Sequence, residues 1–337
     1  MTVRLCSSGV PTVQKVSYFQ ATVIALVQGV TELFPVSSLG HSVLVPAWIG
    51  GSWQTLVTQS SQATSETSFY LAFIVALHCA TAAALLWFFR DDWVRIVRAF
   101  LRGLGPSIRA RRIEAADPDE RLAWLIVIAT IPVGITGLAL EHVFRTVFAK
   151  PLAASIFLFV NGLILLAGER ARRAAPGVPA AEADDGGAGA ADVATRGRAA
   201  IEVAAARASD RRIARLPWRG GLIVGSFQIL ALFAGISRSG VTMVGGLWRG
   251  LDHEDAARFA FLLATPVIFA AGVLKLPTLA GSAGAHIHGQ VLLGVVITGL
   301  TAYMSVRFLV RWFETRTLRP FAYYCLVVGA LSIVHFA

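Results

Sequence analysis

The sequence predicts an all-α integral membrane protein with six transmembrane helices plus two re-entrant helix hairpins, arranged as an inverted-topology repeat. Composition is the first observation behind this prediction. Of the 337 residues, 55% are hydrophobic and 15% are charged, whereas soluble domains contain roughly 25% charged residues. The other two observations are a set of long apolar runs and the clustering of Lys and Arg at the ends of those runs.

Six apolar runs are long enough to cross a bilayer, which takes roughly 17–25 helical residues. They cover about 69–89, 122–140, 152–168, 259–276, 290–306 and 321–337. Two further apolar regions, 16–50 and 220–248, are interrupted by polar residues and glycine. We interpret each as a helix–break–helix hairpin that enters and leaves the membrane by one face. Non-helical backbone at that depth must be buried in protein or line a wet cavity.

The Lys and Arg residues predict the orientation. Of the 30, 24 lie in four connections, 90–121, 169–219, 249–258 and 307–319. The N-terminal tail and the intervening connections hold only four. By the positive-inside rule the first set is cytoplasmic and both termini lie outside. The net charge of +10 is therefore a feature of membrane topology, and nucleic-acid binding is not expected. Within the first connection, the stretch 91–112 alternates Arg with apolar residues, which is typical of an interfacial helix on the inner leaflet.

The whole chain, 1–337, is expected to form a single polytopic membrane domain, with a first half at about 16–168 and a second half at about 220–337. Residues 169–219 between the halves are charged and rich in Ala and Gly, a composition that cannot bury a core. We interpret this segment as a flexible cytoplasmic loop with a helix near 198–215.

An internal repeat supports the inverted arrangement. A shift of 200 residues pairs four positions of the two interrupted regions: Gln28 with Gln228, Val36 with Ile236, Ser37 with Ser237, and Gly40 with Gly240. The two hairpins open to opposite sides, and each is followed by three spans, so the halves are related by inversion. In transporters built on this plan, broken helices meet near the midplane and form the binding site.

The first interrupted region contains the polar stretch "QGVTELFPVSSLGH", residues 28–41. Polar groups at membrane depth are costly, so they are expected to face protein, water or a ligand. Glu32 can act as a general base, a metal ligand or an ion-pair partner, and Gln28 lies one helical turn before it on the same face. Ser38 offers a nucleophilic hydroxyl, and His41 can shuttle protons near neutral pH. A lone membrane histidine more often serves packing, but the grouping with Glu32 and Ser38 favours catalysis.

The second interrupted region contains "AGISRSGVT", residues 234–242, with Arg238 at its centre. A guanidinium offers a rigid fork of donors suited to phosphate. The neighbouring hydroxyls of Ser237, Ser239 and Thr242 can add hydrogen bonds. The alternative is structural pairing of Arg238 with Glu32 of the other hairpin, which is compatible with a functional site.

His78 and Lys275 also lie within apolar runs. Helix contact and snorkelling of the side chain explain both, so neither is assigned a role. Cys6, Cys79 and Cys325 are scattered, without metal-binding spacing or a pairing pattern.

With both motifs in view, the chain resembles the bacterial undecaprenyl-diphosphatases, the bacitracin-resistance family. The first signature of that family is Glu or Gln, three residues, Glu, and then a Pro-Val-Ser-Ser-x-Gly-His stretch. The second is Pro-Gly-x-Ser-Arg-Ser-Gly-x-Thr. This sequence departs from the family at two positions, since Gln28 stands where glutamate is commoner and Ala234 replaces the proline. The resemblance covers nearly the whole chain apart from an enlarged loop around 171–215.

The resemblance implies hydrolysis of undecaprenyl diphosphate to undecaprenyl phosphate and inorganic phosphate. This reaction recycles the lipid carrier for peptidoglycan synthesis and confers bacitracin resistance. It implies an active site on the outer face of the bacterial plasma (inner) membrane and a divalent cation, Mg²⁺ or Ca²⁺, with Glu32 as the candidate ligand. The residues carried over as catalytic are Glu32, Ser38, His41 and Arg238. Those carried over as substrate- or phosphate-binding are Gln28, Ser37, Ser237, Arg238, Ser239 and Thr242.

Several alternatives stay open at this point. Ser38 can attack phosphorus with His41 or Glu32 as its base, or else His41 or water attacks directly. A flippase or transporter of the polyprenyl phosphate lipid fits the inverted repeat equally well, and a non-catalytic scaffold is a third alternative. The expected partners are the polyprenyl diphosphate lipid and the bilayer. A homodimer is one option for the oligomeric state.

Overall fold

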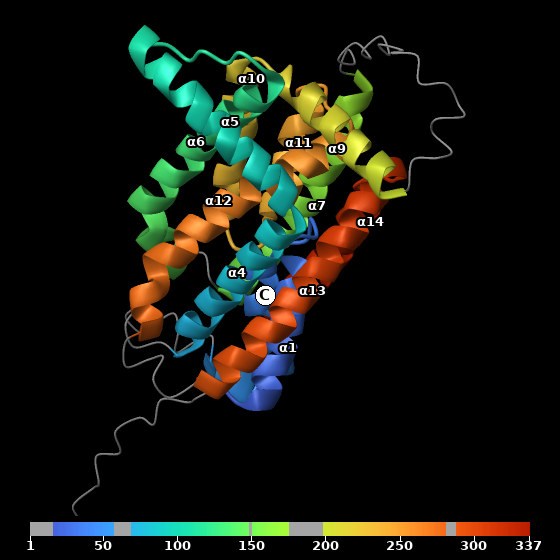
Figure 1. Cartoon of the computed structure of the whole chain (residues 1–337). Helices are drawn as coiled ribbons and strands as arrows, with labels where there is room; N and C mark the ends of the chain where they lie inside the picture. The colour runs from blue at the N-terminus through green and yellow to red at the C-terminus, as the bar shows by residue number, and fades with distance from the viewer. Residues whose placement is uncertain (1–15, 57–68, 148–149, 175–197, 281–287) are drawn as a thin grey trace, which may run out of the picture.

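The computed structural model describes residues 16–56, 69–147, 150–174, 198–280 and 288–337, and the regular structure of these residues is entirely helical (Figure 1). In chain order the elements are α1 (Tyr18–Thr31), α2 (Ser38–Ile49), α4 (Phe69–Phe88), α5 (Arg90–Ala110), α6 (Pro118–Val147), α7 (Pro151–Ala174), α9 (Arg198–Ala214), α10 (Trp218–Phe227), the 3-10 helix η1 (Gln228–Leu232), α11 (Arg238–Trp248), α12 (His253–Ala280), α13 (His288–Thr315) and α14 (Arg319–Phe336). The all-α class is confirmed.

Five of the described helices contain a segment that is long and apolar enough to cross a membrane: Pro118–Leu140, Pro151–Arg172, His253–Val273, His288–Thr315 and Arg319–Phe336. A sixth arises when α4 and α5 are taken together, although an 84° bend separates them. These segments follow the predicted runs in order, and α4 covers the run expected at 69–89. The described helices therefore form a multi-pass membrane protein.

Two breaks interrupt the shorter apolar helices where the sequence predicts them. The first separates α1 from α2, and Ser37 adopts a positive φ of 70° there. The second separates η1 from α11, and Gly235 adopts a φ of 114°. A Cβ atom at Gly235 would lie 2.4 Å from the carbonyl oxygen of Ala154, so conformation and space both require glycine at this position.

Both breaks end in the same kind of helix cap. The hydroxyl of Ser37 accepts a hydrogen bond from the backbone N–H of Gly40 at 3.2 Å, at the start of α2. The hydroxyl of Ser237 accepts one from the backbone N–H of Gly240 at 3.2 Å, at the start of α11. Such caps satisfy donors that a helix start leaves without partners. Two pairs of positions in the proposed repeat thus make the same cap hydrogen bond, although φ is 70° at Ser37 and −87° at Ser237.

A buried asparagine of α7 joins the two breaks. The side-chain N–H of Asn161 donates to the carbonyl oxygen of Pro35 at 3.1 Å, and its amide oxygen accepts from the backbone N–H of Ser237 at 3.0 Å. The backbone N–H of Gly235 also donates to the Ser37 hydroxyl at 3.2 Å. Asn161 is fully buried. Segments that are remote in the sequence are therefore held side by side against α7.

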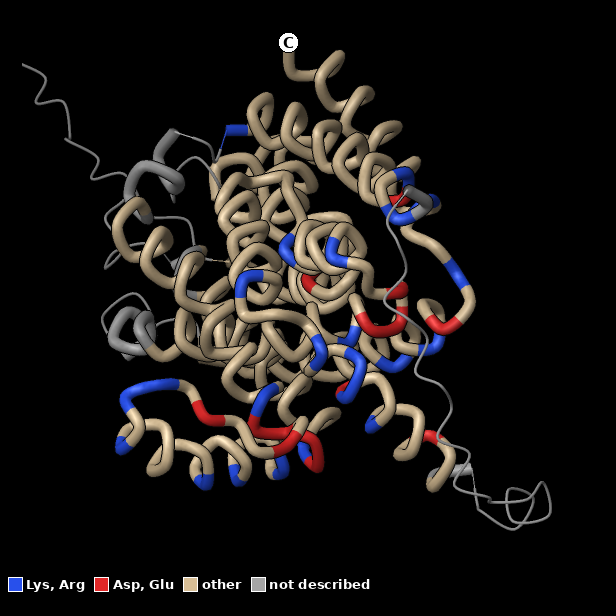
Figure 2. Tube along the Cα trace, turned by 90° about the horizontal axis from the view of Figure 1, so that it is seen from above, with Lys and Arg blue, Asp and Glu red and all other residues tan. Residues whose placement is uncertain are grey.

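At one end of the bundle, α9 is fixed by buried ion pairs. Asp210 accepts two hydrogen bonds from Arg258 of α12, at 2.7 and 2.9 Å, and it also pairs with Arg95 of α5. Arg212 binds both oxygens of Asp255 at 2.7 Å. Figure 2 looks down on this end and shows basic and acidic residues gathered along the helices there. Within the connection 169–219, α7 continues to Ala174 and α9 occupies the helix expected near 198–215, while residues 175–197 lie outside the described part.

Asp210→Ala should lower the free energy of unfolding by about 3 kcal/mol, because it removes one partner from two largely buried arginines. The expected loss is at the lower end of the usual range for breaking a buried ion pair, since Asp92 remains an ion-pair partner of both Arg95 and Arg258. Denaturant unfolding of the purified protein in detergent micelles measures the effect. Asp91→Ala is the matched control, because the Asp91 side chain is 89% exposed, and this variant should unfold like the unmodified protein.

Candidate active site

The carboxylate of Glu32 lies at the centre of the candidate site, in the break after α1, and Glu32 is only 7% exposed. Its Oε1 accepts a hydrogen bond from the guanidinium of Arg238. Its Oε2 accepts one from the Ser38 hydroxyl and one from the Gln28 amide, the latter at 2.9 Å. The Nε2 atom of His78 lies 3.4 Å from the same oxygen. Side chains from α1, α2, α4 and α11 thus converge on one carboxylate.

This arrangement has two chemical consequences. A buried carboxylate is stable as an anion only when charged and hydrogen-bonding partners surround it, and Arg238 supplies the opposite charge. The hydroxyl of Ser38 has a single proton, which it donates to Glu32. Glu32 is therefore placed to accept that proton when the serine oxygen becomes a nucleophile.

His41 is held away from this pair by other partners. Its Nδ1 lies 2.7 Å from the carbonyl oxygen of Ser37, and its Nε2 lies 2.8 Å from the hydroxyl of Tyr324 on α14. A carbonyl oxygen can only accept, so Nδ1 carries the hydrogen, and Nε2 of the neutral ring accepts from Tyr324. In the part of the chain that the structure describes, His41 makes no hydrogen bond to Ser38 or Glu32. Of the two candidate bases for Ser38, the geometry favours Glu32.

The three hydroxyls of the second motif bind backbone groups. The hydroxyl oxygens of Ser237 and Ser239 lie 3.1 Å apart, and both hydroxyls donate to the carbonyl oxygen of Phe34 at 3.3 Å. Thr242 donates to the carbonyl oxygen of Arg238 at 2.7 Å. All three hydroxyl-bearing residues are buried. In this state they fix the backbone around Arg238 and Phe34.

Three residues of the site carry no role in the sequence-based prediction: His78, Tyr324 and Asn161. His78 had a usable signal, because a titratable residue inside a membrane span is by default a candidate for function. Tyr324 and Asn161 had no comparable signal. Tyr324 joins α14 to α2, and Asn161 joins α7 to both breaks. These are contacts between segments that are distant in the sequence.

The residues around Glu32 fit a divalent cation only in part. Among the described residues, no group of three or more His, Cys, Asp or Glu side chains could hold a metal ion. The side-chain oxygen of Gln28, however, is buried without a hydrogen-bond partner next to Glu32. Magnesium is commonly bound by one or two carboxylates together with substrate phosphates. Glu32 and Gln28 therefore suit a cation that arrives with a phosphate group, rather than a site built from protein ligands alone.

The fold and this site define a multi-pass membrane protein in which buried charged and polar side chains gather where two helix breaks meet. The chain belongs to the bacitracin resistance protein BacA family, whose family model matches residues 21–331. It is 58% identical to undecaprenyl-diphosphatase 2 of Frankia alni, over 96% of this chain and 99% of that protein. It is 54% identical to the undecaprenyl-diphosphatase of Mycolicibacterium paratuberculosis, over 95% and 98%. The undecaprenyl-diphosphatase of Mycobacterium avium is also 54% identical, over 96% and 98%. The resemblance seen in the two motifs is confirmed.

Proposed function

We propose that this protein is an undecaprenyl-diphosphate phosphatase, which hydrolyses the lipid diphosphate to undecaprenyl phosphate and inorganic phosphate. The observation that carries the proposal is the meeting of Ser38 and Arg238 on the Glu32 carboxylate inside a membrane bundle. A hydroxyl nucleophile, a base and a phosphate-binding fork are the groups that phosphoryl transfer needs. Relatives of nearly equal length carry the same activity in their names. Recycling of the carrier lipid would also account for resistance to bacitracin.

The contacts suggest an order of events. Arg238 exchanges its contact with Glu32 for the terminal phosphate, and this exchange frees the carboxylate. Glu32 then takes the Ser38 proton while the serine oxygen forms a bond to phosphorus. The bond from phosphorus to the bridging oxygen breaks, and undecaprenyl phosphate leaves with the electron pair. Glu32 gives the proton to the departing undecaprenyl phosphate and is again a carboxylate. It then takes a proton from water as the water oxygen bonds to phosphorus, the bond from phosphorus to the Ser38 oxygen breaks, and that proton returns to the serine oxygen as inorganic phosphate is released. Direct attack by water, activated by the same carboxylate, is the alternative.

The other motif residues act in support of these steps. His41 and Tyr324 form a hydrogen-bonded pair at 2.8 Å that can hold or return a proton near the leaving phosphate. Ser37, Ser237, Ser239 and Thr242 keep the breaks in shape, and rotation of a hydroxyl would let it donate to phosphate. A divalent cation, Mg²⁺ or Ca²⁺, held by Glu32 and the Gln28 amide oxygen, would neutralise phosphate charge as the bridging bond breaks.

We also propose that the two breaks belong to re-entrant hairpins of an inverted repeat, in the plasma (inner) membrane, with the site open to the outer side. The shared serine caps and the 24 of 30 basic residues in alternate connections support this arrangement. Cysteine labelling in intact cells tests it, after replacement of Cys6, Cys79 and Cys325. An impermeant maleimide should label Ser52→Cys and leave Ala110→Cys unlabelled until the cells are opened. The reverse result would contradict the orientation.

A flippase of the polyprenyl phosphate is the competing function, because broken helices that meet at a buried site are also found in transporters. Purified protein in detergent micelles distinguishes the two, since micelles leave no second compartment to transport into. Release of inorganic phosphate from undecaprenyl diphosphate with multiple turnovers is the expected result. Lipid movement across liposomes without phosphate release would contradict the enzyme and support the flippase.

A further inference from the structure

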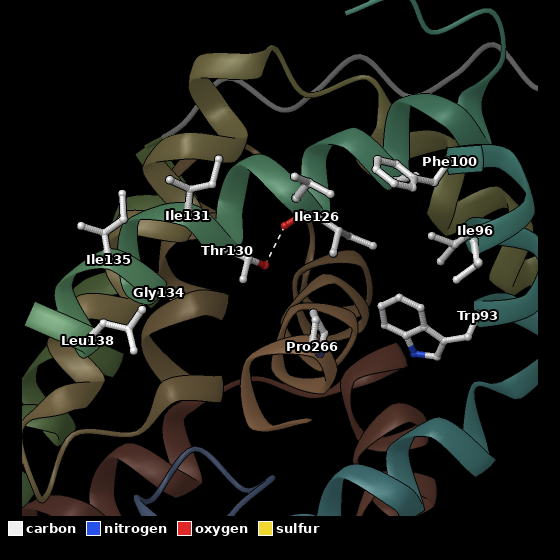
Figure 3. Close-up of a pocket in the computed structure, with 13 residues that line it drawn as sticks. Trp93, Ile96, Phe100, Ile126, Thr130, Ile131, Gly134, Ile135, Leu138 and Pro266 are labelled. Carbon is white, nitrogen blue, oxygen red and sulfur yellow. Dashed lines mark hydrogen bonds between the residues drawn. The ribbon is translucent and has the colours of Figure 1, made fainter. Parts of the chain in front are cut away.

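Two pockets in the described part of the chain differ in their chemistry. The larger, about 510 Å³, lies between α5, α6 and α12, and Figure 3 shows that apolar side chains such as Ile126, Ile131 and Leu138 line it. The smaller, about 250 Å³, lies between α7 and α14, and three of its lining side chains are charged. It is lined by Leu166, Glu169, Arg170, Arg319 and Tyr323. Sites for drug-sized ligands take roughly 300–1,000 Å³, so the smaller pocket suits a ligand of a few polar groups.

This polar pocket lies at one boundary of the membrane. Its arginines are at the ends of two apolar spans, since Arg319 begins one span and Arg170 is two residues from the end of another. Beyond the pocket, α14 continues into the bilayer with Tyr323, Val327 and Leu331 on one face, each 57–59% exposed. A lipid whose hydrocarbon lies on this face of α14 would therefore carry its headgroup at the pocket.

The carboxylate of Glu169 in this pocket has partners for one oxygen only. Its Oε1 accepts from the backbone N–H of Leu318 at 2.7 Å and lies 2.7 Å from the Nε2 atom of His253. Among the described residues, no hydrogen bond or ion pair reaches Oε2. Glu169 is only 5% exposed, but Oε2 keeps some accessible surface. A largely buried carboxylate oxygen without a partner is costly, so it points to a donor that a ligand supplies.

The two arginines of the pocket also lack partners. Neither Arg170 nor Arg319 makes an ion pair or a side-chain hydrogen bond with any described residue, Glu169 included. Arg319 is also the first residue of α14, and the N-terminal end of a helix carries a partial positive charge. Guanidinium groups bind phosphate strongly. The pocket therefore presents both positive and negative groups that are not paired with each other.

We propose that this pocket binds the headgroup of a zwitterionic phospholipid with a primary ammonium group, of the phosphoethanolamine type. The phosphate lies against Arg170 and Arg319, and the ammonium group donates to Oε2 of Glu169. The hydrocarbon chains follow the exposed face of α14. A phosphate without the ammonium group would leave the Glu169 carboxylate unbalanced, and a trimethylammonium group has no N–H to donate. Glu32 and Arg238 line no part of this pocket, so its occupancy does not depend on the proposed phosphatase activity.

The chain offers matched variants for the test. Arg170→Gln removes a charge from the pocket, and Arg172→Gln removes one from the same end of α7 outside it, and both arginines are exposed. Glu169→Gln keeps an oxygen that can accept from Leu318 and His253 but loses the negative charge that faces the ligand. Thermal unfolding in detergent checks that Glu169→Gln, at a buried position, is folded.

Native mass spectrometry of the full chain in detergent measures the binding of phosphatidylethanolamine, phosphatidylcholine and phosphatidylglycerol with the same acyl chains. One phosphatidylethanolamine should bind saturably, about tenfold more tightly than either other lipid, the factor expected for one hydrogen bond between charged groups. Arg170→Gln should weaken that binding by about tenfold for the same reason. Glu169→Gln should lose the preference among the three lipids, and Arg172→Gln should bind like the unmodified protein.

Three results would overturn the proposal. The first is equal binding of the three lipids, or tighter binding of phosphatidylglycerol, by the unmodified protein. The second is unchanged binding of phosphatidylethanolamine in Arg170→Gln. The third is displacement of phosphatidylethanolamine by an equimolar amount of glycerophosphoethanolamine, which has the same headgroup without acyl chains, because a soluble compound would then be the ligand.

Discussion

Glu32→Gln should lower the rate of phosphate release from undecaprenyl diphosphate by about 10³-fold, within the usual range for loss of a general base. The substitution keeps the size of the side chain but removes the negative charge and the ability to accept the Ser38 proton. It also leaves the Arg238 guanidinium without its buried anion. Steady-state phosphate release by purified protein, over a range of Mg²⁺ concentrations, measures the effect. Glu314→Gln, at an exposed position on α13, is the control and should keep normal turnover.

The dependence on magnesium separates two roles of Glu32. If the carboxylate served only as a metal ligand, a high Mg²⁺ concentration would restore turnover in Glu32→Gln. We expect turnover to stay low at saturating Mg²⁺, because proton transfer is lost as well. The variant Glu32→Gln/Ser38→Ala should then be scarcely slower than either single variant, as expected of residues that act as a unit. Turnover close to normal in Ser38→Ala would contradict the serine mechanism and leave direct attack by water.

Arg238→Lys should lower turnover by about 10²-fold or more, a change of roughly 2.7 kcal/mol in the barrier. Lysine keeps the positive charge but loses the planar fork that binds two phosphate oxygens together. The same phosphate-release assay applies, and Arg211→Lys, at an exposed position on α9, is the matched control. Near-normal turnover in Arg238→Lys would show that charge alone is needed. Normal activity in Arg238→Ala would remove the residue from the site.

The parts of the fold that depend on local sequence were predictable. Membrane spans follow from run length and hydropathy, and the helix breaks follow from residues such as Pro35 and Gly235. The contact between Glu32 and Arg238 was also predictable from the sequence, because pairing of Arg238 with a carboxylate was the stated alternative to phosphate binding. Two opposite charges at membrane depth must find partners, and the repeat places their segments together.

The contacts that were not predictable depend on side-chain direction and on distant segments. Ser38 and His41 lie three residues apart on one helix, a spacing that allows them to interact. Ser38 instead turns back across the break to Glu32, and His41 turns toward Tyr324 on α14. The charge pattern of α9 likewise did not reveal that Asp210 is buried against α5 and α12.

The amide of Asn161 has a mechanical consequence for the protein. Its two hydrogen bonds, at 3.1 and 3.0 Å, fasten the backbone of both breaks to one point on α7. To move one break relative to the other, the protein would have to leave a buried amide and a backbone group without partners, at a cost of about 1–3 kcal/mol for each group. Asn161 therefore holds the two breaks together, so that Ser38, which follows the first break, and Arg238, which follows the second, keep a constant separation while substrate enters and product leaves.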